Sequence, residues 1–307
     1  MSQYVLRTNQ LSKQFKNQMA LNKVNLSIPQ GSIYGFIGQN GAGKSTLIRI
    51  VAGLAYPTAG SMELFGESSE RALIEARRRI GTIIEGPALY AHMTAAENLE
   101  AHRLLRGIPG RACIDKTLAL VGLRDTGKKK ARNFSLGMKQ RLGLAIALLG
   151  DPEFLILDEP INGLDPMGVV EIRQLLMKLN REYGITILIS SHILSELHLL
   201  ATHYGIIHHG HLLEQLTAAE LNAKCQHYLH IKVDQPDKAA AIIETGLHTT
   251  AYEVMPDGVI KLFRHVDTPG KVSAHLVKEG LVIEQFMPMG EDLEAYFTSR
   301  IGGVSHV

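Results

Sequence analysis

Gly38-Gln39-Asn40-Gly41-Ala42-Gly43-Lys44-Ser45-Thr46 is the stretch that decides the fold of this 307-residue chain. It fits the Gly-x4-Gly-Lys-Ser pattern of a phosphate-binding loop at every fixed position. An apolar run precedes it at residues 31–37, and apolar residues at helical spacing follow at residues 44–52. A glycine-rich loop between a strand and a helix exposes backbone N–H groups, and the helix start adds the positive end of its dipole. The stretch therefore predicts a nucleoside triphosphate site in an α/β fold.

Within this loop, two side chains have separate predicted tasks. Lys44 is expected to reach the β- and γ-phosphates, and the hydroxyl of Ser45 is expected to bind Mg²⁺. The rest of the predicted phosphate cradle consists of Gly38, Asn40, Gly41, Gly43 and Thr46. A chance match is the competing explanation, and the strand-loop-helix context disfavours it.

Two adjacent carboxylates, Asp158 and Glu159, follow a buried-strand pattern at residues 154–157. In α/β sheets, ligands bind at the carboxyl ends of the parallel strands. We expect Asp158 to bind Mg²⁺ and Glu159 to polarise the attacking water as a general base. The alternative is a pair of surface acids at a strand end, which the phosphate loop upstream disfavours.

Two further polar residues follow. His192 comes after an apolar strand pattern at residues 186–189 and the pair Ser190-Ser191, so we predict a contact with the γ-phosphate. A purely structural histidine is the alternative. Asp165 lies in the turn sequence Gly163-Leu164-Asp165-Pro166 and is a candidate nucleotide-binding residue, with simple turn chemistry as its alternative.

The motif Phe134-Ser135-Leu136-Gly137-Met138-Lys139-Gln140 completes the set. It resembles the signature motif of the ATP-binding cassette (ABC) family, which normally reads Leu-Ser-Gly-Gly-Gln. Ser135 and Gly137 match, and the departures at Phe134, Leu136 and Met138 suit a helix start that offers backbone N–H groups and one hydroxyl. With the preceding motifs, the chain resembles the nucleotide-binding subunit of an ABC transporter, densely over residues 4–215.

The resemblance implies a fold and an assembly. The fold is a P-loop NTPase of ABC type, with a mixed sheet core, an antiparallel β subdomain and a helical subdomain at about residues 86–140. Two subunits would pair head to tail, with each ATP between Lys44 of one copy and Ser135 and Gly137 of the other. Phe15 falls where the family places an aromatic residue that stacks on adenine; a core phenylalanine in a short strand is the alternative.

One departure concerns Glu85, which stands where the family usually has a glutamine that touches Mg²⁺ and links to the membrane partner. A carboxylate also binds Mg²⁺, so we expect Glu85 to be a metal ligand that keeps the coupling role. Around it, residues 83–85 and 97–99, with Pro87, Tyr90 and Thr94, resemble the subfamily that exports bacitracin-like and lantibiotic peptides.

This resemblance implies an ATPase that drives export of a peptide antibiotic, drug or similar amphipathic substrate through a separate multi-span membrane subunit. The chain would then lie in the cytoplasm, on the inner face of the membrane. An importer ATPase is one alternative. A soluble ABC ATPase acting on nucleic acid or ribosomes is another, disfavoured by the single cassette and the lack of a heptad run.

Composition agrees with this reading. A formal net charge of +2 creates no general field for nucleic acid, so no nucleic-acid partner is expected. The two cysteines fit no metal spacing and indicate a reducing compartment. No signal peptide is expected at the start of the sequence. No apolar stretch reaches the roughly 18–20 residues that a spanning helix needs, so the membrane part is expected on another polypeptide.

The C-terminal part differs from the cassette. Residues 204–214 read as a hairpin with Gly210 in its turn; a metal site on its histidines is disfavoured because adjacent strand residues point to opposite faces. Residues 216–307 read as β-α-β-β-α-β, a small α+β domain of ferredoxin-like order, followed by a last helix. It has no catalytic constellation and is expected to help dimerise, sense a ligand or cap the ATPase core.

Overall fold

A computed structural model describes residues 3–225, 227–290 and 293–302 of the chain. The chain divides into two compact units, one ending at Ala218 and one beginning at Ala219. The first unit extends three residues past the expected boundary at 215, because strand β10 (His211–Thr217) still belongs to its sheet. Each unit is described separately below.

The first unit is built on a six-stranded sheet within these residues, in the order β10-β9-β4-β8-β7-β6. Its other strands are β4 (Ile33–Ile37), β6 (Ile80–Ile83), β7 (Phe154–Asp158), β8 (Thr186–Ser191) and β9 (His203–His208). Neighbours pair in parallel, except for the antiparallel hairpin of β9 and β10. The predicted mixed sheet is therefore confirmed. Strand β8 lies between β4 and β7, and all three run parallel. Their carboxyl ends therefore meet at one edge of the sheet, where Ile37 pairs with Ser191 and Asp158 pairs with Ser190.

A second sheet of the first unit is antiparallel, as expected. It contains β1 (Tyr4–Phe15), β2 (Gln18–Val24), β3 (Ser27–Pro29) and β5 (Ala59–Leu64). The short apolar pieces at residues 4–35 predict that this whole stretch belongs to the antiparallel group, and this prediction is wrong at its end. Residues 33–35 enter β4 of the mixed sheet, whose five residues are all buried, as a strand covered on both faces requires.

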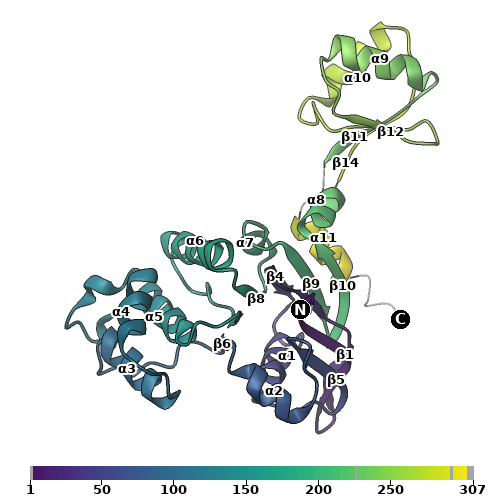
Figure 1. Ribbon diagram of the computed structural model, residues 1–307. Coiled ribbons are helices and arrows are strands. Elements are labelled where there is room, and N and C mark those ends of the chain that lie inside the picture. Colours follow the sequence, from purple (N-terminus) through teal and green to yellow (C-terminus); the bar gives the residue numbers. More distant parts are fainter. Residues whose placement is uncertain (1–2, 226, 291–292, 303–307) are drawn as a thin grey trace. The chain divides into compact units, whose positions relative to one another are not determined.

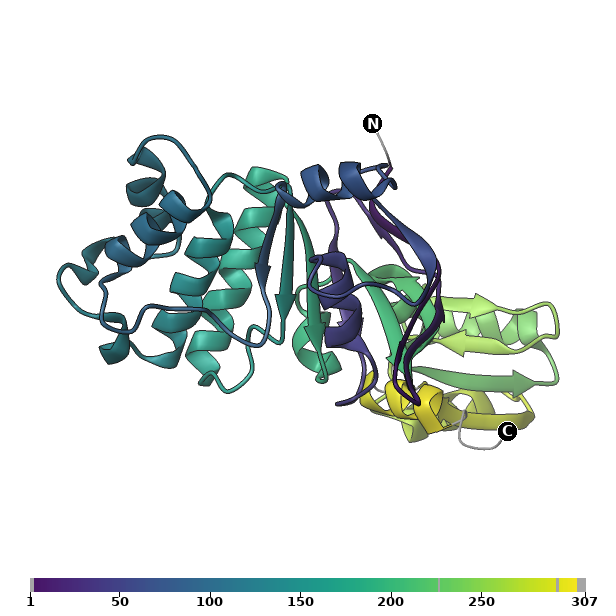
Figure 2. The same ribbon diagram turned by 90° about the horizontal axis from the view of Figure 1, so that it is seen from below.

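Helix α1 (Lys44–Val51) packs between the two sheets. Its side chains Leu47 and Ile48 share one core with Phe36 of β4 and Leu21 of β2. The other helices of this unit are α2 (Glu70–Arg77), α3 (Ala95–Leu105), α4 (Ala112–Leu120), α5 (Leu136–Leu148), α6 (Pro166–Tyr183) and α7 (Leu194–His198), with short 3₁₀ turns η1 (Arg124–Thr126) and η2 (Ala131–Asn133). Both views show α3, α4 and α5 on the side of the mixed sheet away from the antiparallel sheet (Figures 1 and 2).

Residue patterns predict helices over residues 70–79, 138–149 and 194–201, and each of these differs from the structure at one or both ends. Helix α2 stops at Arg77 instead of residue 79, because the chain turns there into β6. Helix α5 starts at Leu136 instead of 138, because Ser135 caps it. Helix α7 stops at His198 instead of 201.

The predicted hairpin of β9 and β10 is confirmed, with Gly210 at its turn. Its turn touches the phosphate loop: the N–H of Gly210 donates to the carbonyl of Ala42 at 2.9 Å, and its carbonyl accepts from the N–H of Asn22 at 2.9 Å. His208 is buried and His209, just past the end of β9, is exposed. Their ring centroids lie 4.0 Å apart, so the expectation that adjacent histidines here point to opposite faces is wrong.

The second unit has the predicted β-α-β-β-α-β order, flanked by two helices. Its elements are α8 (Ala218–Cys225), β11 (Tyr228–Val233), α9 (Pro236–Gly246), β12 (Tyr252–Val254), β13 (Ile260–Leu262), α10 (Pro269–Lys278), β14 (Ile283–Met289) and α11 (Leu293–Gly302). Helix α8 was not predicted. The strands form one antiparallel sheet in the order β12-β13-β11-β14. Leu229 and Ile231 of β11 pack with Ile243 of α9 and Val272 of α10 in a separate core.

None of the helices in the described part of the chain combines the length and the apolar character that crossing a bilayer requires.

Candidate nucleotide-binding site

The phosphate loop joins β4 to α1 and depends on glycine at two points. Gly43 has a φ of 112°, and a Cβ placed on it would lie 2.6 Å from the carbonyl oxygen of Ala20. At Gly38, a Cβ would lie 2.5 Å from the carbonyl oxygen of Ile207 on β9. A side chain fits at neither position, so the loop lies tightly against β2 on one side and β9 on the other.

A hollow of about 280 Å³ opens beside the loop. It is lined by Phe15, Gln18, Ala20, Gln39, Asn40, Gly41, Gly43, Lys44, Ser45 and Thr46. Phe15 ends β1, and its side chain is 47% exposed, which excludes the alternative of a core phenylalanine. The ammonium of Lys13 lies 4.9 Å from the centroid of its ring. The hollow thus combines an aromatic face with backbone N–H groups, as an adenine nucleotide requires.

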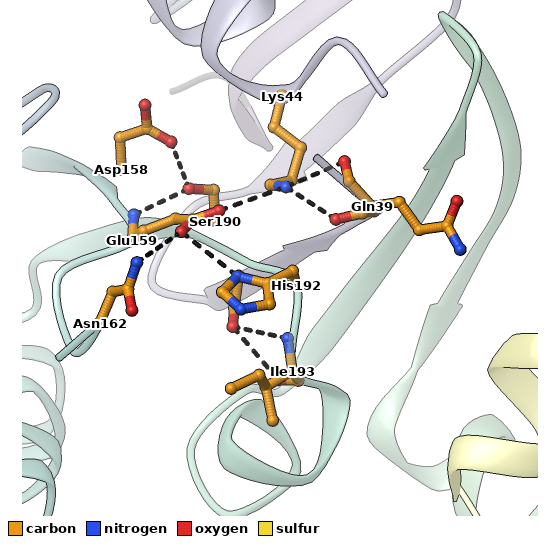
Figure 3. Close-up of polar contacts among 10 residues, drawn as sticks. Gln39, Lys44, Asp158, Glu159, Asn162, Ser190, His192 and Ile193 are labelled. Atoms are coloured by element: carbon orange, nitrogen blue, oxygen red, sulfur yellow. Dashed lines mark hydrogen bonds and ion pairs between the residues drawn. The ribbon is translucent and has the colours of Figure 1, made fainter. Parts of the chain in front are cut away.

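Lys44 is buried, and its ammonium has protein partners on several sides. It donates to the carbonyl oxygens of Gly38 at 2.7 Å and Gln39 at 3.3 Å. It also lies 3.4 Å from Oε1 of Glu159 (Figure 3). The phosphate loop and the end of β7 are therefore joined by an ion pair.

The carboxylates at the end of β7 are positioned by β8. The hydroxyl of Ser190 donates to Oδ1 of Asp158 at 2.5 Å and accepts from the N–H of Glu159 at 3.0 Å (Figure 3). Asn162 donates to Oε2 of Glu159 at 3.2 Å, and Nδ1 of His192 lies 3.3 Å from the same oxygen. The structure therefore brings Lys44, Asp158, Glu159 and His192 into one cluster.

The carboxyl edge of the mixed sheet carries oxygen groups of the kind that a divalent cation binds. Ser45 lines the hollow, and the buried carboxylate of Asp158 stands at the end of a strand two places from β4 in the sheet. A hydroxyl and a carboxylate are the hard oxygen donors that Mg²⁺ prefers. Glu85, the third predicted ligand, is placed differently: it is exposed, has a φ of 60° and pairs with Arg49 of α1.

The remaining predicted residues lie at helix starts. The hydroxyl of Ser135 accepts from the N–H of Met138 at 3.2 Å and caps α5. A Cβ on Gly137 would meet nothing within 4 Å, so this helix start is open. Asp165 accepts from the N–H of Gly168 at 2.8 Å and caps α6, which is the turn chemistry named as its alternative. Among the described contacts, none joins these three residues to the phosphate loop.

Residues before the signature motif are fastened to the start of α3. Thr94 and Glu97 form a capping box there, and Lys130 donates to Glu97 at 3.0 Å. The N–H of Thr94 and the ammonium of Lys130 lower the pKa of the Glu97 carboxyl to about 2. Asn98 is fully buried and hydrogen-bonds both backbone groups of Tyr90. The pattern at residues 90–99 thus has a structural task in the helical subdomain.

Sequence patterns did not indicate the contacts of two residues of the site and of one residue beside it. The sequence predicts Ser190 only as part of a strand end, because its contact with the carboxylates depends on the pairing of β8 with β7. Asn162 gave no signal beyond being a polar residue in the next turn. Gln140 belongs to the signature motif, but the sequence predicts no role for it. Its side chain donates to the carbonyl oxygen of Pro160 at 2.6 Å.

Comparison with known proteins identifies the family. The sequence model described as "ABC transporter" matches residues 21–162. The chain is 44% identical to a bacitracin transport ATP-binding protein of Bacillus licheniformis, over 97% of this chain and 98% of that protein. The chain belongs to the ABC transporter family. A lantibiotic transport ATP-binding protein of Streptococcus pyogenes is 45% identical over 68% of this chain and 89% of its own length.

A solved ABC cassette supports the assignment of the fold. A dimeric ATP-binding cassette bound to ADP and phosphate has a TM-score of 0.63 and 26% identity, covering 69% of this chain and 98% of its own. As an ABC transporter ATPase, this chain binds ATP and couples its hydrolysis to transport. The cluster around Lys44 and Glu159 is the candidate site for that hydrolysis.

Proposed function

We propose that this chain powers export of a peptide antibiotic, or a similar amphipathic substrate, through a separate membrane subunit. One observation carries the proposal: the 44% identity to a bacitracin transport ATP-binding protein extends over 97% of the chain. It therefore includes the C-terminal unit, which lies beyond the matched ABC family region at residues 21–162. The chain would then work at the inner face of the membrane.

In the proposed reaction, the phosphates of ATP take the place of Glu159 as partners of Lys44. The hollow beside the loop receives the nucleotide, with the ring of Phe15 against adenine. Glu159, released from Lys44, polarises the attacking water, and His192 contacts the γ-phosphate. Ser45 and Asp158 are the residues that would hold Mg²⁺, which supplies positive charge to the phosphates. Glu85 keeps the link between this site and the membrane subunit.

We further propose a head-to-tail pair of subunits. The chain carries one signature motif, and its open helix start at Ser135 and Gly137 shares no described contact with the chain's own phosphate loop. A second copy would supply that helix start to each nucleotide, and the similar cassette solved as a dimer supports such pairing. Asp165, at the start of α6, is proposed to face the same seam.

The strand order β12-β13-β11-β14 supports a ferredoxin-like fold for the second unit. Interstrand NMR contacts of β11 with β13 and β14 in the full chain test this, and a different strand order would contradict it.

The transport proposal is tested by co-purification from native membranes. A tagged Glu159→Gln variant is expected to hold ATP without turning it over, so that the assembly persists in mild detergent with ATP and Mg²⁺. A stoichiometric multi-span membrane protein should co-purify. When that protein is reconstituted with the unaltered chain, adding bacitracin or a lantibiotic should raise the ATPase rate. Recovery of ribosomes, nucleic acid or a soluble dimer alone would contradict the proposal.

The dimer is tested with Ser135→Ala, compared with Ser69→Ala as a matched control. Both changes remove a serine cap from a helix start, of α5 and α2 respectively, at a cost of about 1 kcal/mol. Only the Ser135 variant should lose ATP-driven dimerisation while still binding ATP as a monomer, as measured by light scattering and equilibrium binding. Normal dimerisation of this variant would show that the helix start does not reach a partner's nucleotide.

A further inference from the structure

Gln140 is a polar side chain in the most apolar part of α5. The helix is buried from Leu142 to Leu148, and Gln140, at its near end, is only 6% exposed. Its Nε2 donates to the carbonyl oxygen of Pro160, and its Oε1 is buried without a hydrogen-bond partner among the described residues. Burying half of an amide unpaired destabilises a fold. A methionine of similar size would avoid this cost, so the retained hydrogen bond points to a task outside stability.

The acceptor of this bond lies next to Glu159. The N–H of Glu159 is held by Ser190 of β8, and the carbonyl of the following residue, Pro160, is held by Gln140 of α5. Glu159 itself has a φ of 48°, which is rare for a residue with a side chain. Such a conformation persists only where neighbouring groups fix it on several sides. Gln140 is therefore one of the supports of the turn that positions this carboxylate.

Two further contacts lie on the same side of α5. A Cβ on Gly143 would lie 2.5 Å from Cβ of Pro87, in the loop that contains Glu85. One turn further on, the carbonyl oxygen of Ala147 would lie 2.2 Å from a Cβ on Gly81 of β6. Positions 140, 143 and 147 share one face of a helix. Neither close contact leaves room for α5 to slide past its neighbours. A displacement of the start of α5 must therefore also move the turn at Pro160 and the loop at Pro87.

We propose that Gln140 is a positioning residue that couples the two ATP sites of the dimer. The start of α5, at Ser135, engages the nucleotide held by the partner subunit, and Gln140 passes the resulting position of α5 to Glu159 of its own subunit. The proposal rests on the head-to-tail dimer proposed above. Hydrolysis in one site then depends on occupation of the other, through one hydrogen bond that lies in neither site.

The first test is Gln140→Met, which keeps the volume and removes the donor. We expect kcat for ATP to fall about tenfold with little change in KM, and the Hill coefficient to fall toward one. Asn98→Leu is the matched control, because it removes a buried amide whose hydrogen bonds stay inside the helical subdomain. The control should keep the Hill coefficient of the unaltered chain. An unchanged kcat and Hill coefficient in Gln140→Met would overturn the proposal.

The second test is Gln140→Glu, which separates positioning from packing. A buried carboxyl resists ionisation, and only its protonated form donates to the carbonyl of Pro160. Activity relative to the unaltered chain should therefore rise as the pH falls from about 8 to about 6, whereas Gln140→Met should show no such rise. A flat ratio across this range would overturn the role of the hydrogen bond.

A third measurement distinguishes failure of the coupling proposal from failure of the proposed dimer. Glu159→Gln and the double variant Glu159→Gln/Gln140→Met should both dimerise with ATP and Mg²⁺, because Gln140 acts after nucleotide engagement. If only the double variant fails to dimerise, Gln140 serves assembly and the coupling proposal is wrong. If the parent also fails, the head-to-tail dimer is wrong, and the pH ratio of Gln140→Glu still decides whether the bond positions Glu159.

Discussion

The ammonium of Lys44 lies 3.4 Å from Oε1 of Glu159, so the lysine of the phosphate loop is paired with the proposed general base. Replacing Glu159 with glutamine removes the base and should slow ATP turnover about 100-fold or more. Phosphate release at saturating ATP measures this. Glu153→Gln is the control, because Glu153 precedes the same strand and pairs with Arg79 instead. Near-normal turnover of Glu159→Gln would reject its role as base.

Glu85 is expected to serve the reaction, and its ion pair with Arg49 is expected to matter little. Exposed pairs of this kind typically contribute under about 1 kcal/mol. ATPase rates should fall about tenfold in Glu85→Ala and less in Glu85→Gln, which keeps an oxygen donor. Arg49→Met should leave the rate nearly unchanged, since it breaks the pair but keeps the carboxylate. Unchanged rates in both Glu85 variants would exclude a metal or coupling role.

Phe15 is expected to contribute to nucleotide affinity through its exposed ring. Stacking of a base on an aromatic side chain contributes about 1–3 kcal/mol, so Phe15→Ala should weaken ATP binding about tenfold or more, and Phe15→Tyr should bind normally. Fluorescent-nucleotide titration measures both. Tyr56→Ala is the control, because it removes an aromatic side chain that is 76% exposed and lies outside the hollow. Equal affinities of Phe15→Ala and the control would place adenine elsewhere.

Ser190 is expected to tune metal binding without touching the metal. Its hydroxyl orients Asp158, and loss of such a supporting hydrogen bond typically costs about 10–100-fold in metal affinity. Ser190→Ala should raise the Mg²⁺ concentration for half-maximal ATPase by that factor. The neighbouring Ser191→Ala should not, because that hydroxyl accepts from the N–H of Ile193. Identical Mg²⁺ curves for the two variants would contradict the assignment.

The carboxyl group of Glu97 is expected to make the stability of the folded chain depend on pH. Its pKa is about 2 in the folded chain, below the ordinary value of 4.5, mainly because of the N–H of Thr94. A lowered carboxyl pKa stabilises the fold above about pH 4.5, and this contribution is lost as the pH falls toward 2. The urea midpoint of the unaltered chain should exceed that of Glu97→Gln at neutral pH, and the gap should shrink in acid. A gap that stays constant with pH would contradict this; Glu75→Gln provides the surface control.

Local patterns predicted which strand ends and loop carry the clustered polar residues. The loop around Lys44 and the strand ends at Asp158 and His192 were recognisable because each feature lies within a few consecutive residues. The β9–β10 hairpin was predicted for the same reason, since Gly210 separates two strand patterns.

What depended on distant pairing was not predictable. The double role of Ser190 arises from the register between β7 and β8, which pairs it with Asp158. The membership of residues 33–35 in the mixed sheet depends on strands that come more than a hundred residues later. The buried bond from Gln140 to Pro160 joins two segments whose nearness is set by the packing of α5, and no single segment contains that information.

The hairpin of β9 and β10 has a consequence for how distant events reach the nucleotide. Its turn is hydrogen-bonded to Ala42 of the phosphate loop, and its second strand ends at Thr217, directly before the boundary of the second unit. A force on the chain at Ala219 thus acts directly on β10, and only this strand separates Ala219 from the turn that contacts the phosphate loop. A partner that binds the C-terminal unit is therefore expected to influence ATP binding through β10 and the turn that contacts the phosphate loop.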